Sequence, residues 1–246
     1  MSGRMRGGDP LLLVDADHPI PEDGNPELTA ADENWPRVLL ERQAARLLTA
    51  CIQAVGGREQ IVPVSGWRSR EEQQQIWDDT TEKEGEAFTR QYVARPGCSE
   101  HQTGLAIDLG LAAPHIDFIR PNFPDNGVCR AFREQAGKYG FILRYPAGKE
   151  HITGIAHEPW HFRYVGAPHG AIMAQMGLTL EEYLKLLDEY PDGDNPFRFR
   201  MGEYRFAICR LAEDCPEEEL PRGEGGRQLS RDNRGGLIVT TWNREE

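Results

Sequence analysis

Three short segments of the chain combine residue types that can bind a metal ion or transfer a proton. In the segment SEHQTGLAIDLG, His101 and Asp108 stand seven positions apart. In IAHEPWHFRYVG, Glu158 precedes His161 by three positions. In SGWRSREEQQQIW, Arg68 follows an apolar stretch and carries a permanent positive charge. Together these five residues supply two imidazoles, two carboxylates and one guanidinium.

Two imidazoles and one carboxylate are a typical ligand set for a catalytic zinc ion. His101, Asp108 and His161 would give zinc three protein ligands and leave the fourth position for water, as catalytic sites require. Such a set also accepts other divalent ions. Glu158 would act as general base beside that water. Arg68 would stabilise the oxyanion of a tetrahedral intermediate or hold a substrate carboxylate.

The sequence His157-Glu158-Pro159-Trp160-His161 also matches the HExxH motif of helical zinc proteases. That motif requires a helix, which places positions i and i+4 on one face. Pro159 would lie inside such a helix, at a cost of about 3 kcal/mol, and it favours extended geometry in the preceding residue. We therefore expect no helical site here and do not expect His157 to be a ligand.

Each of these patterns is weak evidence when taken alone. A histidine seven positions before an aspartate often caps a turn. An arginine at the start of a helix is often a solvent-exposed residue that binds nothing. From spacing alone, a folded domain without a metal stays an open alternative.

The predicted secondary structure places these residues on strands and next to turns. Strands are expected at residues 61–65, 105–109 and 161–165, and a short one at residues 11–14, before a segment rich in turn formers. Helices are expected at residues 35–55, 69–77, 128–139 and 178–187. Ser69 with Glu72 and Thr179 with Glu182 have the spacing of capping boxes. Mixed elements without a repeating βαβ order predict an α+β fold, an antiparallel sheet with flanking helices.

The C-terminal part of the chain has a different composition. Residues 191–196, PDGDNP, are typical of a linker. Residues 197–210 and 237–242 alternate as strands do, on either side of a loop rich in glycine and arginine. We predict a catalytic domain at residues 1–190 and a small β-rich appendage at residues 196–246.

Composition limits the possible partners and compartment. A chain of 246 residues with 39% hydrophobic and 28% charged residues is typical of a globular domain. Its net charge of −12 argues against binding to nucleic acid or to an anionic membrane surface. The apolar run 11–14 is too short for a signal peptide or a membrane span. Five cysteines without paired spacing favour a reducing compartment, so we expect a cytoplasmic protein without membrane insertion; a protein whose leader was removed is the alternative.

The three segments together closely resemble the motifs of the VanY and VanXY-type D,D-carboxypeptidases. These are zinc enzymes of the group that shares a fold with the Hedgehog signalling domain. SGWRSREEQQQIW resembles their SGYRS-x4-Q motif, with Trp67 where tyrosine is common, and CSEHQTGLAIDL resembles their S-x-HxxGxAxD motif. The stretch GFILRYPAGKEHITGIAHEPWHFRYVG is similar to the family almost throughout. The resemblance covers residues 11–187.

The resemblance implies roles for particular side chains. It implies a zinc ion held by His101, Asp108 and His161, with Glu158 as catalytic base. It also implies that Arg68 and Gln73 bind substrate and stabilise the transition state. Ser99 is expected near the terminal substrate residue, and Trp160 is expected to line the pocket.

The implied activity is hydrolysis of D-Ala-D-Ala termini in a dipeptide or a peptidoglycan precursor, in vancomycin resistance or in wall recycling. Three alternatives stay open: an L,D-carboxypeptidase, a peptidoglycan endopeptidase, and a non-catalytic zinc-bearing binding module. The sequence does not rank dipeptide, tetrapeptide and pentapeptide substrates, and it does not determine the oligomeric state.

Overall fold

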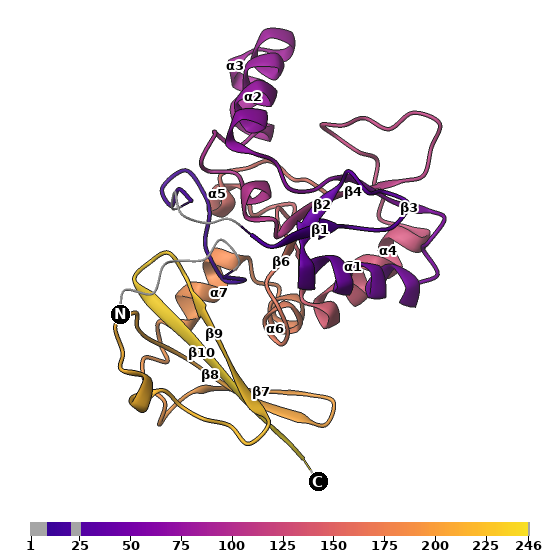
Figure 1. Cartoon of the computed structure of the whole chain (residues 1–246). Coiled ribbons are helices and arrows are strands. Elements are labelled where there is room, and N and C mark those ends of the chain that lie inside the picture. Colours follow the sequence, from indigo (N-terminus) through magenta and orange to yellow (C-terminus); the bar gives the residue numbers. More distant parts are fainter. Residues whose placement is uncertain (1–8, 21–25, 246) are drawn as a thin grey trace.

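A four-stranded antiparallel sheet forms the centre of the molecule (Figure 1). The computed structural model describes residues 9–20 and 26–245. The strands follow the order β3-β4-β6-β5; they are β3 (Ile61–Ser65), β4 (Ala106–Leu111), β6 (His161–Tyr164) and β5 (Phe141–Leu143). Three of them coincide with the predicted strands to within two residues at each end. The predicted α+β fold with an antiparallel sheet is confirmed.

Two helices pack on this sheet and form the main core. They are α1 (Arg42–Ala54) and α4 (Gly127–Ala136), the latter continued by the short helix η2 (Gly137–Tyr139). Leu48 of α1 and Phe132 of α4 are fully buried in one cluster with Phe162 of β6. Burial of each such side chain stabilises the fold by about 1.5–3 kcal/mol. Gly140 ends η2 with a left-handed backbone, φ 82°, a conformation that glycine adopts without strain.

The first helix begins later than predicted. Residues 39–41 form strand β2 (Leu39–Glu41), which pairs with β1 (Leu28–Ala30). Glu41 then caps α1, because its carboxylate accepts hydrogen bonds from the backbone N–H groups of Gln43 and Ala44. A helix starting at residue 35 was therefore wrong, since pairing with β1 holds the preceding residues extended.

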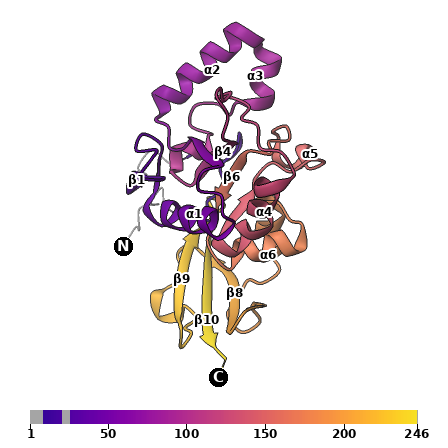
Figure 2. The same cartoon turned by 90° about the vertical axis from the view of Figure 1, so that its right-hand side faces the viewer.

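A helical hairpin projects from the body on the side opposite the C-terminal sheet (Figure 2). It consists of α2 (Arg70–Glu84) and α3 (Glu86–Tyr92). The predicted capping box is present, with Ser69 and Glu72 bonded reciprocally. Helix α2 runs beyond the predicted end at residue 77 and stops at Gly85, whose φ is 85°.

Three further helices follow the central strands. They are α5 (Glu150–Thr153), α6 (His169–Met176) and α7 (Leu180–Leu187). The predicted capping box of Thr179 and Glu182 opens α7. None of the helices in residues 9–20 and 26–245 is long and apolar enough to cross a membrane.

A second four-stranded antiparallel sheet, in the order β7-β8-β10-β9, forms the C-terminal part. Its strands are β7 (Phe197–Met201), β8 (Tyr204–Ala212), β9 (Gly226–Arg231) and β10 (Gly236–Arg244), with the short helix η3 (Glu217–Glu219) between β8 and β9. Residues 197–210, predicted as continuous, are divided by a turn at Gly202, φ 60°. The glycine- and arginine-rich loop contains the unpredicted strand β9. Ile208 and Ile238 pack in one core with Leu180 and Leu184 of α7, so this sheet shares apolar contacts with the preceding part. The division at residues 190 and 196 stays a prediction.

Residues 11–14 are buried but do not form a strand. Their backbone groups bond to side chains and loops instead of a neighbouring strand. The Leu12 carbonyl accepts a hydrogen bond from Arg163, and the Leu13 N–H donates to the carbonyl of Asp232. The predicted strand was wrong because these tertiary contacts satisfy the backbone. Part of the turn-rich segment that follows, residues 21–25, lies outside the described residues.

Candidate active site

The register of three strands brings the predicted ligands together. On β4, Asp108 is the cross-strand partner of Ser65 on β3 and of His161 on β6. The short helix η1 (Glu100–Thr103) carries His101 and ends at Gly104, whose left-handed backbone, φ 72°, leads the chain into β4.

His101, Asp108 and His161 form a compact group of possible metal ligands. One ligand atom from each lies within 4.8 Å of the others, and all three residues are buried. The two carboxylate oxygens of Asp108 face different imidazoles: Oδ2 lies 3.3 Å from Nε2 of His101 and Oδ1 lies 3.0 Å from Nδ1 of His161. Ligand atoms around a tetrahedral zinc ion lie roughly 3.4 Å apart. The donor set and its spacing therefore fit zinc.

A backbone carbonyl orients the first of these imidazoles. Nδ1 of His101 lies 2.7 Å from the carbonyl oxygen of Gly66, so Nδ1 donates and Nε2 faces Asp108. Gly66 follows β3 and lies against β2, where a Cβ atom would come within 2.2 Å of the Leu39 carbonyl oxygen. Only glycine allows this close approach.

Glu158 and His161 converge because the chain turns at Pro159. The N–H of His161 donates to the carbonyl of Glu158 at 3.2 Å, which closes a turn. The Glu158 carboxylate then lies 3.6 Å from Nδ1 of His161. Residues 155–160 contain no helix, and His157 bonds instead to the carbonyl of Tyr145 at 2.9 Å. The helical HExxH arrangement is absent, as the sequence predicted.

Buried charges determine the protonation of the site. Burial opposes the ionised form of Asp108, but the two histidines outweigh it and hold the pKa of Asp108 well below its usual range. Burial opposes the charged form of His161 as well, yet the neighbouring carboxylates of Asp108 and Glu100 raise its pKa to about 9. Burial lowers the pKa of His101 to about 4 and raises that of Glu158 to about 8. The carboxylate of Asp108 is thus held ionised between two imidazoles, and these three groups can ligate a divalent cation.

Arg68 is held beside the ligand group by three hydrogen bonds. Its guanidinium donates to Oδ2 of Asp108 at 2.9 Å, to Oγ of Ser65 at 2.9 Å and to Oε1 of Gln73 at 3.3 Å. Gln73 in turn donates its amide to the carbonyl of Ala94 at 2.8 Å. Gln73 therefore fixes the orientation of the arginine against the end of α3.

All eight predicted site residues line one cleft. They are Arg68, Gln73, Ser99, His101, Asp108, Glu158, Trp160 and His161. The cleft is also lined by residues that the sequence did not single out, among them Tyr92, Glu100, Ile119, Tyr145 and Ile155. It places the guanidinium of Arg68, the buried carboxyl group of Glu158 and a possible metal site around the same space.

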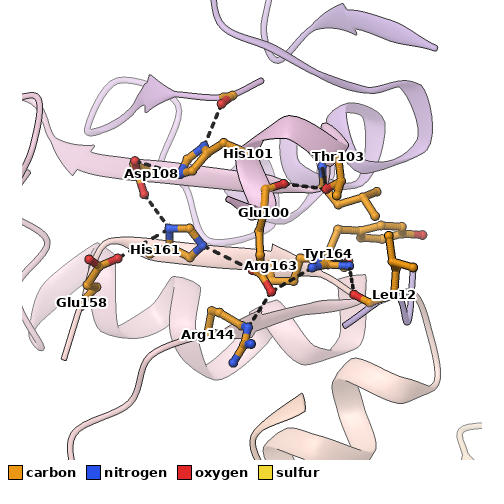
Figure 3. Close-up of polar contacts among 12 residues, drawn as sticks. Leu12, Glu100, His101, Thr103, Asp108, Arg144, Glu158, His161, Arg163 and Tyr164 are labelled. Atoms are coloured by element: carbon orange, nitrogen blue, oxygen red, sulfur yellow. Dashed lines mark hydrogen bonds and ion pairs between the residues drawn. The ribbon is translucent and has the colours of Figure 1, made fainter. Parts of the chain in front are cut away.

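Sequence reasoning missed a buried ionic cluster behind the site (Figure 3). Glu100 lies 2.7 Å from Nε of Arg144 and 2.9 Å from Nη1 of Arg163, and all three side chains are fully buried. Both arginines stand in apolar strand segments, FILRY and HFRY. A charged residue in such a segment is a sign of a buried partner, but the sequence does not say which residue that partner is.

The family comparison agrees with this geometry. The family model described as VanY, D-alanyl-D-alanine carboxypeptidase, matches residues 37–167. The chain belongs to the VanY family. The matched range includes all eight candidate site residues.

VanY-family relatives are similar over most of this chain. The bifunctional D-Ala-D-Ala dipeptidase and D-Ala-D-Ala carboxypeptidase VanXYC of Enterococcus gallinarum is 43% identical over 175 residues, which cover 70% of this chain and 92% of that protein.

Solved structures extend the similarity. The vancomycin resistance D,D-dipeptidase VanXYg, in complex with a D-Ala-D-Ala phosphinate analog, is 44% identical, with a TM-score of 0.88 over 95% of this chain and 93% of its own. A vancomycin resistance D,D-pentapeptidase VanY in complex with Zn(II) is 33% identical, with a TM-score of 0.62 over 71% of this chain and 98% of its own. The first match spans the C-terminal sheet as well as the VanY core, because it covers nearly the whole chain.

Proposed function

We propose that this chain is a zinc-dependent D,D-carboxypeptidase and D,D-dipeptidase that hydrolyses the D-Ala-D-Ala termini of peptidoglycan precursors. The observation that carries the proposal is one cleft that joins a His101–Asp108–His161 ligand group to the base Glu158 and the cation Arg68. The VanXYC relative is named for both activities, and this chain matches it over 92% of that protein's length.

Different residues of the cleft carry out different steps of peptide hydrolysis. A zinc ion bound by the three ligands supplies a Lewis acid and lowers the pKa of a bound water to about 7. Glu158, which lies 3.6 Å from the ligand His161, accepts a proton from the attacking water. It then returns the proton to the amine of the leaving D-alanine.

Arg68 neutralises the negative charge that develops on the scissile carbonyl oxygen. Its bonds to Asp108 and Gln73 hold the guanidinium in place before substrate binds, so little reorganisation is needed during the reaction. Ser99 binds near the terminal residue, and the indole of Trp160 forms part of the pocket wall.

Product release from three substrates tests this function. The zinc-loaded protein is incubated with D-Ala-D-Ala, with a UDP-linked pentapeptide ending in D-Ala-D-Ala, and with the matching tetrapeptide, and free D-alanine is measured. Metal-dependent release from the first two is expected, and their ratio gives the balance of dipeptidase and carboxypeptidase activity. Release from the tetrapeptide alone would identify an L,D-carboxypeptidase instead. No release from any substrate by protein with bound zinc would favour a binding module.

We further infer a role before precursor export, in the cytoplasm, where removal of D-Ala-D-Ala leaves altered termini and so contributes to vancomycin resistance. All five cysteines are free thiols, and Cys51, Cys129 and Cys209 are buried, which favours a reducing compartment. Fractionation of cells producing the full-length protein tests the location, and the minimum inhibitory concentration of vancomycin, with Glu158→Gln as control, tests the role.

A further inference from the structure

The carboxylate of Glu100 is fully buried directly behind the ligand His161 (Figure 3). One of its oxygens, Oε1, accepts a hydrogen bond from Nε of Arg144 at 2.7 Å and lies 2.9 Å from Nη1 of Arg163. The other oxygen, Oε2, has no hydrogen-bond partner within normal geometry among the described residues. Burying a charged oxygen without a partner is costly, so Oε2 is expected to face a donor.

That donor is Nε2 of His161, the imidazole nitrogen that does not face the other metal ligands. Nε2 of His161 is likewise buried without a hydrogen-bond partner among residues 9–20 and 26–245. It lies 3.5 Å from Oε2 of Glu100. The two unpartnered atoms therefore face each other, and a shift of a few tenths of an ångström turns the contact into a charge-assisted hydrogen bond.

We propose that Glu100 is a positioning residue of the metal site: it accepts the Nε2 proton of His161 and so keeps the Nδ1 lone pair directed at the metal. The inference rests on the metal site of the proposed function. Nδ1 is the nitrogen that faces Asp108 at 3.0 Å. A histidine ligand is fixed in its tautomer by the bond that its other nitrogen donates.

The two imidazole ligands are thus oriented by different acceptors. His101 donates Nδ1–H to the neutral carbonyl of Gly66 at 2.7 Å, and His161 donates Nε2–H to an anion. An anionic acceptor makes the imidazole a stronger donor to the metal than a neutral one does. Glu100 therefore contributes to metal affinity as well as to geometry.

Two arginines prevent the carboxylate from rotating away. Arg144 also donates two hydrogen bonds to the carboxylate of Glu181 on α7, at 2.7 and 3.0 Å. Arg163 donates to the carbonyl of Leu12 at 2.9 Å. Each guanidinium is held on its far side by a different segment of the chain, so Glu100 is anchored independently of the metal.

A purely structural role for Glu100 is the alternative, because it balances the charge of two buried arginines. Glu181 provides the matched control, since it pairs with the same Arg144 but lies on α7, away from the ligand group. Glu100→Gln keeps the shape of the side chain. In this variant the amide oxygen accepts the hydrogen bonds of the arginines, so the amide N–H group points at Nε2 of His161. Nε2 then has to accept a hydrogen bond, which places the His161 proton on Nδ1. A protonated Nδ1 cannot bind the metal.

Zinc affinity is measured by competition with a chromophoric chelator for wild type, Glu100→Gln and Glu181→Gln, with thermal unfolding recorded for each apoprotein. We expect Glu100→Gln to lower the affinity by about 10–100-fold, whereas Glu181→Gln lowers the unfolding temperature and leaves the affinity within about twofold of wild type. Unchanged affinity in folded Glu100→Gln would overturn the proposal. An equal loss in both variants would also overturn it, because the effect would then belong to the ionic cluster as a whole.

A second measurement needs no variant at position 100. In zinc-loaded wild type with 15N-labelled histidine, His161 should show a protonated Nε2 and a metal-bound Nδ1, and His101 should show the reverse. Metal on Nε2 of His161 would overturn the proposal even if Glu100→Gln fails to fold. Neither measurement uses substrate. If the protein fails to hydrolyse D-Ala-D-Ala, the zinc affinities and the histidine tautomers can therefore still be interpreted. If it hydrolyses D-Ala-D-Ala but binds zinc equally well without the Glu100 carboxylate, only this inference is refuted.

Discussion

The Glu158 carboxylate lies 3.6 Å from Nδ1 of His161, although a regular strand would direct side chains three positions apart to opposite faces. The turn at Pro159, closed by the hydrogen bond from the His161 N–H to the Glu158 carbonyl, brings them to the same side. A base and a metal ligand are thereby placed next to each other by a four-residue segment.

Glu158→Gln should abolish most turnover while zinc stays bound. The amide keeps the size of the side chain but accepts no proton, and general-base catalysis contributes about 10²–10⁴-fold. D-alanine release and zinc content per chain measure the two effects. The exposed Glu150, on the neighbouring α5, provides the control variant Glu150→Gln, which should match wild type. Full activity of Glu158→Gln would show that another group is the base.

His161→Ala should lose zinc and activity together, whereas His157→Ala should keep zinc. Of these two histidines, only His161 belongs to the ligand group, whereas His157 bonds to the carbonyl of Tyr145. Metal content after dialysis against a limiting zinc concentration measures the difference. Loss of zinc in His157→Ala would restore the HExxH arrangement as the metal site.

Arg68→Ala should reduce kcat by about 10²–10³-fold, the usual cost of removing a group that stabilises an oxyanion. Arg68→Lys should recover only part of the loss, because lysine does not reproduce the three hydrogen bonds of the guanidinium. Steady-state kinetics with D-Ala-D-Ala measure kcat and KM separately. The exposed neighbour Arg70 provides the control, Arg70→Ala. A change in KM alone would assign Arg68 to substrate binding.

We expect the free energy of unfolding to decrease in acid because His169 is buried in its neutral form. Its imidazole lies between the hydroxyls of Tyr183 on α7, at 2.7 Å, and Thr240 on β10, at 3.1 Å. Burial lowers its pKa to about 3, below the value of about 6.5 in an unfolded chain. Between these values the unfolded state binds more protons, so the free energy of unfolding decreases as the pH falls below about 6.5, by about 2 kcal/mol at pH 5.

Urea unfolding of wild type and His169→Gln at pH 7 and pH 5 measures this contribution. Glutamine does not titrate in this range, so the variant should lose about 2 kcal/mol less than wild type between the two pH values. An identical loss in both proteins would show that other groups cause the acid sensitivity.

Ile238→Ala should destabilise the whole protein by about 2–5 kcal/mol, as for other buried isoleucines. Ile238 is 1% exposed and packs in the same core as α6 and α7. Leu229→Ala on the neighbouring β9 is the control, because Leu229 is 38% exposed. Denaturant unfolding followed by tryptophan fluorescence measures both. A separate early transition, with the catalytic part unaffected, would show that the C-terminal sheet unfolds alone.

Much of the candidate site was accessible to sequence reasoning because its residues lie in short contiguous motifs. His101 precedes the turn at Gly104 and Asp108 lies on the strand that follows it, and Glu158 and His161 are separated by a single turn. In such segments the local backbone largely determines where the side chains point. The resemblance to a family then linked motifs that spacing alone left unconnected.

Other features were decided by packing between distant segments. The residues at 11–14 have the apolar pattern of a strand, but Arg163 and Asp232 bind their backbone groups. The pairing of Glu100 with Arg144 and Arg163 joins η1 to β6 and to the residue after β5.

By itself, the sequence determined the capping boxes at Ser69 and Thr179, the antiparallel α+β class and the residue types of the site. These depend on hydrogen bonds and hydrophobic patterns within a few residues. Only the tertiary structure decided which carboxylate stands behind His161 and how the C-terminal sheet shares a core with α7. The cost of burying a charge or an apolar side chain depends on which distant groups surround it, and those groups are neighbours only in the folded chain.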